Sequence, residues 1–354
     1  MQWQFRPLDQ AAMDAAQARL DDLIKPVGSL GLLEKWVVRL AGIQGTARPK
    51  IGRKAHLVFA ADNGIWDEGI GTVPYQVTAA QCANMVKGLT AINALCRQVG
   101  AQVRVIDVGV KGDVPGVRAC KVRPGTDNMA QGPAMTRQQA EAALQVGFDQ
   151  AVEAAGEGVQ LLGVGEMGIC NTSTSAAMLS VFSGEPVDLA TGRGVGLDET
   201  LFARKKAAIA RAIQVNQPDP EDPMDVLAKV GGLDIAAMAG AYLGAAACGL
   251  PVIVDGFIAM VAALTAQRIA PQAAQALFLS HASAEPGVAL AARMLGQPPL
   301  NLGMRLGEGT GCPLLMGLMD AALACYEQMG TFSQGNIDAQ NIVEFRDEPT
   351  EGIG

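Results

Sequence analysis

The sequence has little charge and almost no histidine. Charged residues make up 18% of its 354 residues, and it contains two histidines. Seven cysteines are present, but none of them forms a Cys-x-x-Cys pair. The pattern of a Cys/His zinc site is therefore missing, and we expect no metal site. Scattered cysteines in an odd number are typical of reduced thiols, which predicts a cytoplasmic protein.

Positive charge is also scarce. Lys and Arg number 27 against 35 Asp and Glu, which gives a net charge of −8. This balance argues against nucleic acid as a partner. The N-terminus has no basic segment followed by an apolar stretch, so we expect no signal peptide. Residues 236–254 carry no charge, but they are rich in Ala and Gly and are broken by Gly249-Leu-Pro251. We predict a buried helix and a buried strand here, and no membrane span.

Apolar residues are plentiful, at 49% of the chain, and they fall into short runs. We expect strands at residues 55–61, 102–108, 159–164, 251–255 and 276–280. Between them the sequence predicts helices at residues 76–98, 136–155, 172–183, 198–215, 233–248 and 286–295. Continuous apolar strands that alternate with helices are typical of an α/β fold, in which helices cover both faces of a mostly parallel sheet.

Both ends of the chain are predicted to be helical. Residues 8–46 have a helical pattern that breaks at Pro26-Val-Gly28, and Ser29 is expected to cap the next helix. An apolar helix is expected from Gly311 to about Met329. We predict that residues 1–48 and 312–354 form a small helical domain, and that residues 49–311 form an α/β catalytic domain.

The first of three glycine-rich loops follows the strand expected at residue 159. Gly163-Val-Gly165-Glu-Met-Gly168 matches the dinucleotide fingerprint, with Asp188 20 residues further on. One hypothesis is therefore an NAD-dependent oxidoreductase. The charge of Glu166 would repel a pyrophosphate, however. The helix start at Asn171-Thr172 suits one phosphate monoester better. A plain glycine turn also remains open.

The other two glycine loops also carry groups that can bind or react. Gly192-Arg-Gly194-Val-Gly196 precedes Lys205, so backbone amides and an ammonium group are available for a phosphate. In Gly307-Glu308-Gly309-Thr310-Gly311 a carboxylate stands between glycines, which makes Glu308 a candidate general base. Simple turns, with Glu308 stabilised at a helix start, are the alternative. Asp255-Gly256 and His281 are either site walls or structural residues.

These loops belong to a longer ordered series of motifs between about residue 19 and residue 325. The series resembles the nicotinate-nucleotide–dimethylbenzimidazole phosphoribosyltransferase family. Its motifs are Arg19-Leu-Asp-Asp-Leu-Ile-Lys25-Pro26-Val-Gly28-Ser29-Leu-Gly31, Ile43-Gln-Gly45, Ala61-Asp-Asn-Gly64, Asp67-Glu-Gly69, Gln81-Cys-Ala-Asn84, Gly165-Glu-Met-Gly168, Asn171-Thr172, Gly192-Arg-Gly194, Gly231-Gly-Leu-Asp234, Asp255-Gly-Phe-Ile, Ser280-His281, Ser283-Ala-Glu-Pro-Gly287 and Arg305-Leu-Gly-Glu308-Gly-Thr-Gly311.

The resemblance implies transfer of the phosphoribosyl group of nicotinate mononucleotide to 5,6-dimethylbenzimidazole, for the lower ligand of cobalamin. It implies a Rossmann-like sheet domain, a small helical domain from both termini, a homodimer and no cofactor. Glu308 matches the catalytic base, and Gln81 falls beside the benzimidazole pocket. The other substrate-binding residues that we expect are Glu166, Gly168, Asn171, Thr172, Gly194, Lys205, Ser283 and Gly309.

Three positions depart from the family pattern. A histidine is common where Asn63 stands, a serine where Val73 stands, and a small residue where Cys170 stands. The natural acceptor base is therefore left open, and we expect a somewhat different or more apolar base.

The expected chemistry needs one base. The pyridinium leaves without protonation, so a single displacement with inversion requires only a group that removes the imidazole proton. A sensor that binds the nucleotide without turnover is a further hypothesis, but binding alone would not require the Glu308 loop.

Overall fold

The computed structural model describes residues 3–194, 196–338 and 342–345. The chain divides into two compact units, of which the first comprises Met1–Phe5 and Arg53–Leu314. The second comprises Arg6–Gly52 and Leu315–Gly354, and its helices are α1 (Gln10–Asp21), α2 (Leu32–Gln44) and most of α13 (Gly311–Gln328). Ser29 does not cap α2, contrary to the prediction. The helix begins after Gly31, and the Glu34 carboxylate instead accepts the N–H of Leu30 at 2.9 Å.

The first unit is built on a sheet of six strands. Its order is β3-β2-β1-β4-β5-β6, and every strand pair among the described residues is parallel. The strands are β1 (Lys54–Ala61), β2 (Ala101–Gly109), β3 (Arg118–Ala119), β4 (Leu161–Met167), β5 (Val252–Val254) and β6 (Leu277–Leu279). The predicted α/β fold is confirmed. The strand order reverses between β1 and β4, where sheets of this kind bind ligands beyond their carboxyl ends.

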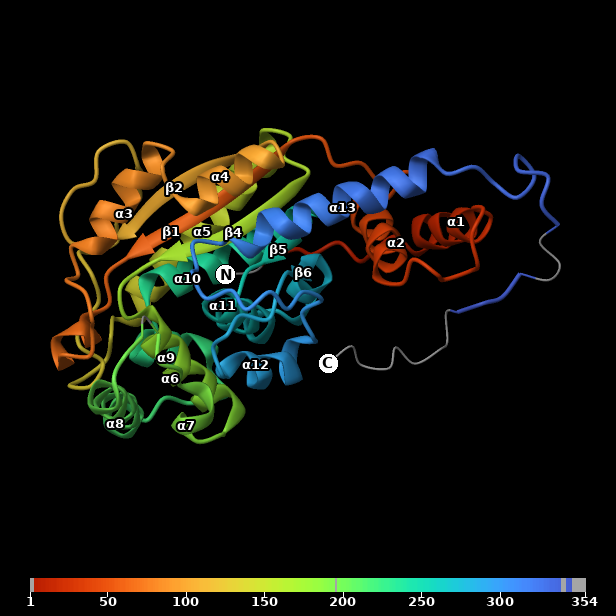
Figure 1. Cartoon of the computed structure of the whole chain (residues 1–354). Coiled ribbons are helices and arrows are strands. Elements are labelled where there is room, and N and C mark those ends of the chain that lie inside the picture. The colour runs from red at the N-terminus through yellow and green to blue at the C-terminus, as the bar shows by residue number, and fades with distance from the viewer. Residues whose placement is uncertain (1–2, 195, 339–341, 346–354) are drawn as a thin grey trace. The chain divides into compact units, whose positions relative to one another are not determined.

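Helices cover both faces of this sheet (Figure 1). The helices of the first unit are α3 (Val77–Val86), α4 (Ala91–Gln98), α5 (Arg137–Gly156), α6 (Asn171–Ser183), α7 (Val187–Ala190), α8 (Glu199–Asn216), α9 (Pro223–Val230), α10 (Leu233–Cys248), α11 (Phe257–Ile269) and α12 (Gly287–Leu295). Alternate residues of β1 separate the two cores. Leu57 and Phe59 face the core of α5 and α10, whereas Val58 and Ala60 face α3 and α4.

The helix predicted at residues 76–98 is wrong as a single element. The chain breaks after α3 at Gly88, whose φ is +76°, and starts again at Thr90. The Thr90 side chain and Asn93 form a capping box at the start of α4. Because of the break, the first turn of α4 has free N–H groups, and that of Ile92 donates to the Glu308 carboxylate.

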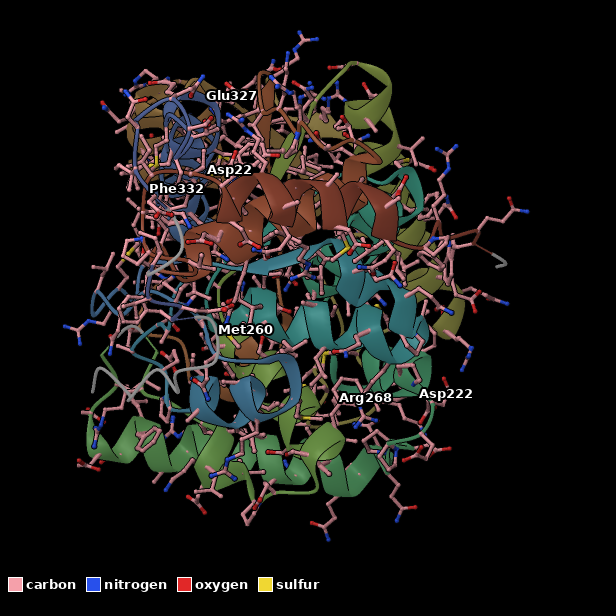
Figure 2. All side chains as sticks on the ribbon, turned by 90° about the vertical axis from the view of Figure 1, so that its right-hand side faces the viewer. Asp22, Asp222, Met260, Arg268, Glu327 and Phe332 are labelled. Carbon is pink, nitrogen blue, oxygen red and sulfur yellow. The ribbon has the colours of Figure 1, made fainter. Side chains whose placement is uncertain are left out.

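The uncharged run at residues 236–254 forms α10 and β5, as predicted. No described helix is both long and apolar enough to cross a membrane. Helix α11, which the pattern did not reveal, follows β5 and buries Met260 (Figure 2). At its end Arg268 donates to the carbonyl oxygens of Phe182 at 2.7 Å and Pro220 at 3.0 Å, and Asp222 caps α9 nearby.

Helices α5 and α10 touch backbone to backbone. A Cβ atom added at Gly147 would lie 1.7 Å from the carbonyl oxygen of Ala237, and one added at Gly240 would lie 1.8 Å from that of Leu144. Since real Cβ atoms never approach so closely, only glycine fits at these two positions. This contact lets α5 and α10 pack together in the core that they share with Leu57 and Phe59 of β1.

Candidate active site

A pocket of about 240 Å³ lies at the carboxyl ends of the strands. The end of β4, the start of α6, helix α3 and the turn before α13 all contribute to its wall. Among its lining residues are eight that the sequence predicted: Gln81, Glu166, Gly168, Asn171, Thr172, Gly194, Ser283 and Glu308. Segments far apart in the chain therefore meet here, as the hydrogen bond between Gln81 and Glu308, 227 residues apart, shows.

Glu308 is buried and its carboxylate is tightly oriented. Oε1 accepts a hydrogen bond from Gln81 Nε2 at 2.6 Å, and Oε2 accepts the N–H of Ile92 at 3.4 Å. Ile92 lies in the first turn of α4, where helix N–H groups favour a carboxylate. The φ of Glu308 is +62°, a left-handed conformation that costs roughly 1–3 kcal/mol for a residue other than glycine. Such strain is typical of active-site residues.

The turn around Glu308 presses directly on β4. A Cβ atom at Gly165 would lie 2.5 Å from the Gly309 nitrogen, and a Cβ atom at Gly309 would lie 2.1 Å from His56 Nε2. Gly163 and Gly165 both lie inside β4, so they do not form the loop after the strand that a dinucleotide fingerprint needs. The dinucleotide fingerprint on which the oxidoreductase hypothesis rested is therefore wrong. Gly165 is instead required because the backbone of the Glu308 turn packs against it.

Glu166 is a buried carboxyl whose pKa is raised. Burial and the nearby charges of Asp234 and Asp255 raise the pKa of Glu166 to about 8, although hydrogen bonds oppose the rise. Asn171 Nδ2 donates to Glu166 Oε2 at 2.5 Å and to Asp234 Oδ2 at 3.0 Å. Glu166 is therefore mostly protonated at neutral pH, and the repulsion of a pyrophosphate that the sequence predicted is largely absent.

Lys205 reaches the site from α8. It is buried, and its Nζ donates to Thr172 Oγ1 at 3.0 Å and to the carbonyl oxygen of Gly192 at 2.9 Å. Burial lowers its pKa, while Glu285 opposes the shift. Lys205 lines a second cavity of about 80 Å³, which shares Thr172 and Gly194 with the main pocket. The two loops and the lysine therefore converge, although Val195 lies outside the described residues.

The positions that depart from the family pattern do not line the pocket of Glu308. Val73 and Cys170 line the smaller cavity together with Lys205. Asn63 is buried and lines neither cavity. The expected effect of Val73 on the acceptor base therefore has no direct contact to support it.

Four further polar side chains line the pocket among the described residues, which the sequence left open or did not single out: Asp255, His281, Glu285 and Arg305. The Asp255 carboxylate accepts the N–H of Gly311 at 2.7 Å and lies 3.6 Å from His281 Nδ1. Burial raises the pKa of Asp255, and His281 opposes the rise. For Asp255 and His281 the signal was their position just past β5 and β6, because parallel strands end at one edge of the sheet.

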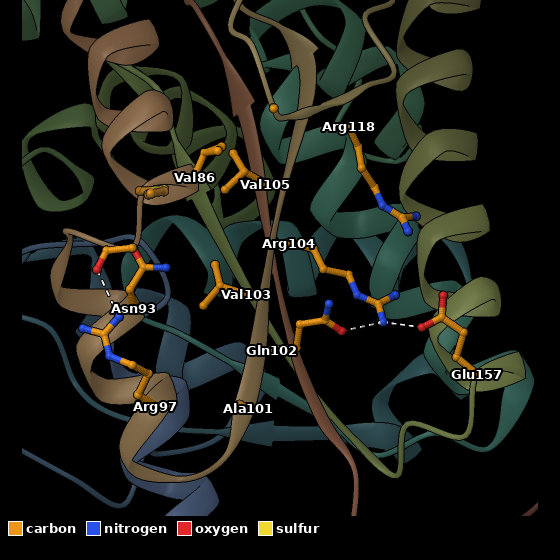
Figure 3. Close-up of a pocket in the computed structure, with 13 residues that line it drawn as sticks. Val86, Asn93, Arg97, Ala101, Gln102, Val103, Arg104, Val105, Arg118 and Glu157 are labelled. Atoms are coloured by element: carbon orange, nitrogen blue, oxygen red, sulfur yellow. Dashed lines mark hydrogen bonds and ion pairs between the residues drawn. The ribbon is translucent and has the colours of Figure 1, made fainter.

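A hollow of about 420 Å³ lies elsewhere, at the start of β2 (Figure 3). Its polar wall includes Arg104, whose guanidinium donates to Gln102 Oε1 at 3.1 Å and also pairs with Glu157. Of β2, only residues 101–105 at the amino end of the strand line this hollow. None of the predicted site residues lines it. The pocket of Glu308 is therefore the stronger candidate.

Comparisons with known proteins find relatives along almost the whole chain. A family model described as "Phosphoribosyltransferase" matches residues 5–337. The chain is 48% identical to the nicotinate-nucleotide–dimethylbenzimidazole phosphoribosyltransferase of Geobacter sulfurreducens over 335 aligned residues. These residues make up 94% of this chain and 95% of that protein. The chain is 49% identical, with the same coverage, to the protein of that name from Desulforudis audaxviator. A crystal structure of CobT from Thermus thermophilus superimposes with a TM-score of 0.88, at 42% identity over 93% of this chain and 99% of that one.

Proposed function

The chain belongs to the nicotinate-nucleotide–dimethylbenzimidazole phosphoribosyltransferase family, and we propose that the pocket around Glu308 is its active site. The enzyme transfers the phosphoribosyl group of nicotinate mononucleotide to 5,6-dimethylbenzimidazole and releases nicotinate. The product, α-ribazole 5′-phosphate, provides the lower ligand of cobalamin. One observation carries the assignment of the site. The Glu308 carboxylate is held by Gln81 and the start of α4 at the wall of the pocket.

Glu308 acts as the general base. One ring nitrogen of the benzimidazole attacks C1′ with its lone pair, and Glu308 takes the proton from the other nitrogen. The bond from C1′ to the pyridinium nitrogen breaks, and its electron pair neutralises the pyridinium to give nicotinate. Because that leaving group needs no proton, no general acid is required. A single displacement on the β-nucleotide inverts C1′ and gives the α-anomer.

The 5′-phosphate binds where α6 begins. Thr172, Gly194 and Lys205 surround the smaller cavity that adjoins the pocket, and a helix N-terminus together with an ammonium group suits a phosphate. Ser283 and Gly168 line the pocket beside it, and Gly309 lets the Glu308 turn approach. Gln81 lies on the acceptor side, because it holds the base that deprotonates the acceptor.

The homodimer, the cytoplasmic location and the two domains are also proposals. The cysteines of the described residues form no disulfide with one another, which supports a reducing compartment.

Incubation with nicotinate mononucleotide and 5,6-dimethylbenzimidazole tests the function. We expect chromatography to show one nicotinate released per ribazole phosphate formed, and NMR to show the α-anomer. Nicotinate riboside, which lacks the phosphate, should react far more slowly. Binding without turnover would support a sensor instead, and a β-configured product would indicate double displacement.

The raised pKa of Glu166 predicts a pH dependence of nucleotide binding. Above a pKa of about 8 this side chain becomes an anion that faces a nucleotide of net negative charge. We expect the Kd for nicotinate mononucleotide, measured by calorimetry, to rise about tenfold between pH 7 and pH 9. Glu166→Gln, which mimics the protonated form, should bind well and lose this dependence. If the variant keeps the same slope, another group is titrating.

A further inference from the structure

The turn that carries Glu308 is held from beneath by two buried side chains. His56, in the third position of β1, lies with its Nε2 3.1 Å from the carbonyl oxygen of Glu308. Asp255, directly after β5, accepts the N–H of Gly311 at 2.7 Å, and the N–H of Gly309 also lowers the pKa of this carboxyl. The backbone from the Glu308 carbonyl to the Gly311 N–H is thus held by one residue of β1 and by the residue that directly follows β5.

His56 is suited to this contact alone. Its side chain is fully buried, and it does not line the pocket. Burial lowers its pKa to about 4, so the ring is neutral at physiological pH and carries one proton. Because Nε2 faces a carbonyl oxygen, that proton resides on Nε2 and is donated. His56 Nδ1 has no hydrogen-bond partner among the described residues.

The turn needs such support because Glu308 has a positive φ of +62°. A residue other than glycine stays in this conformation only where its surroundings impose it. A relaxed turn would move the carboxylate away from Gln81 and from the start of α4. A displacement of about 1 Å at a reacting group is enough to lower a rate about 10²-fold.

We propose that His56 and Asp255 are positioning residues, which hold the Glu308 turn in its reactive conformation. This inference rests on the proposed function, since it assigns them to the reaction of Glu308. Neither residue is required to exchange a proton with substrate. Their effect on turnover should therefore vanish when the Glu308 carboxylate is absent.

A double-mutant cycle tests this dependence. His56→Leu removes the donor and should lower kcat about 10²-fold, with the Kd for nicotinate mononucleotide changed less than threefold. His56→Gln places an amide N–H near the position of Nε2 and should restore most of the turnover. Combined with Glu308→Gln, His56→Leu should lower the residual rate less than twofold further.

The outcomes test the positioning role of His56 separately from the proposed function of Glu308. If His56→Leu lowers the rate of Glu308→Gln by the same 10²-fold, its role is general to the structure and the proposal is wrong. Native turnover in His56→Leu also overturns it, while the proposed function stands. Native turnover in Glu308→Gln overturns the proposed function itself. If His56→Leu does not fold, Asp255→Asn, which keeps the side-chain size and one acceptor, is measured in the same cycle.

Discussion

Glu308→Gln is expected to lower turnover about 10²–10⁴-fold and to leave nicotinate mononucleotide binding close to native. Glutamine has nearly the same size and still offers an oxygen to the Ile92 N–H, so the pocket keeps its shape. It has no carboxylate to remove the benzimidazole proton. Steady-state release of nicotinate gives kcat, and calorimetry gives the nucleotide affinity separately.

The control is Glu141→Gln, which removes an exposed carboxylate of α5 that makes only a surface ion pair. It should leave both kcat and the nucleotide affinity unchanged. Turnover within a few-fold of native in Glu308→Gln would show that another group, or water, takes the proton. A loss of nucleotide binding as large as the loss of kcat would place Glu308 in binding instead.

Most of the fold could be predicted from the sequence because its strands are buried on both faces. Such strands read as continuous apolar runs, and the runs at residues 55–61 and 102–108 fall within β1 and β2. The two residues of β3, Arg118 and Ala119, carry no such signal. The break between α3 and α4 depends on one glycine within a continuous helical pattern.

Some residues that line the pocket carried a local signal in the sequence, as Glu308 did in its glycine loop, whereas Gln81 was expected only from the family resemblance. His56 carried none, because it lies in an apolar run and its partner is 252 residues away. The protonation of Glu166 was also beyond reach, since its pKa depends on burial that only the folded chain creates. Distant contacts and burial are therefore what the sequence pattern leaves out.

The contact between α5 and α10 is another long-range feature that the local sequence pattern does not predict. Gly147 stands in a helix where alanine would be the better helix former by roughly 1 kcal/mol. Nothing in the local pattern explains a glycine there. In the structure the backbone of α10 occupies the space that a side chain would need, at the carbonyl oxygen of Ala237.

Gly147→Ala is therefore expected to destabilise the protein by about 3 kcal/mol or more, because the helices must separate to admit one methyl group. The matched control is Gly156→Ala at the end of the same helix, where an added Cβ meets nothing within 4 Å. That change should leave stability unchanged or raise it by about 0.5–1 kcal/mol. Urea unfolding followed by circular dichroism measures both. Equal midpoints for the two variants would mean that α5 and α10 do not pack this closely, since helix propensity alone favours alanine at both positions.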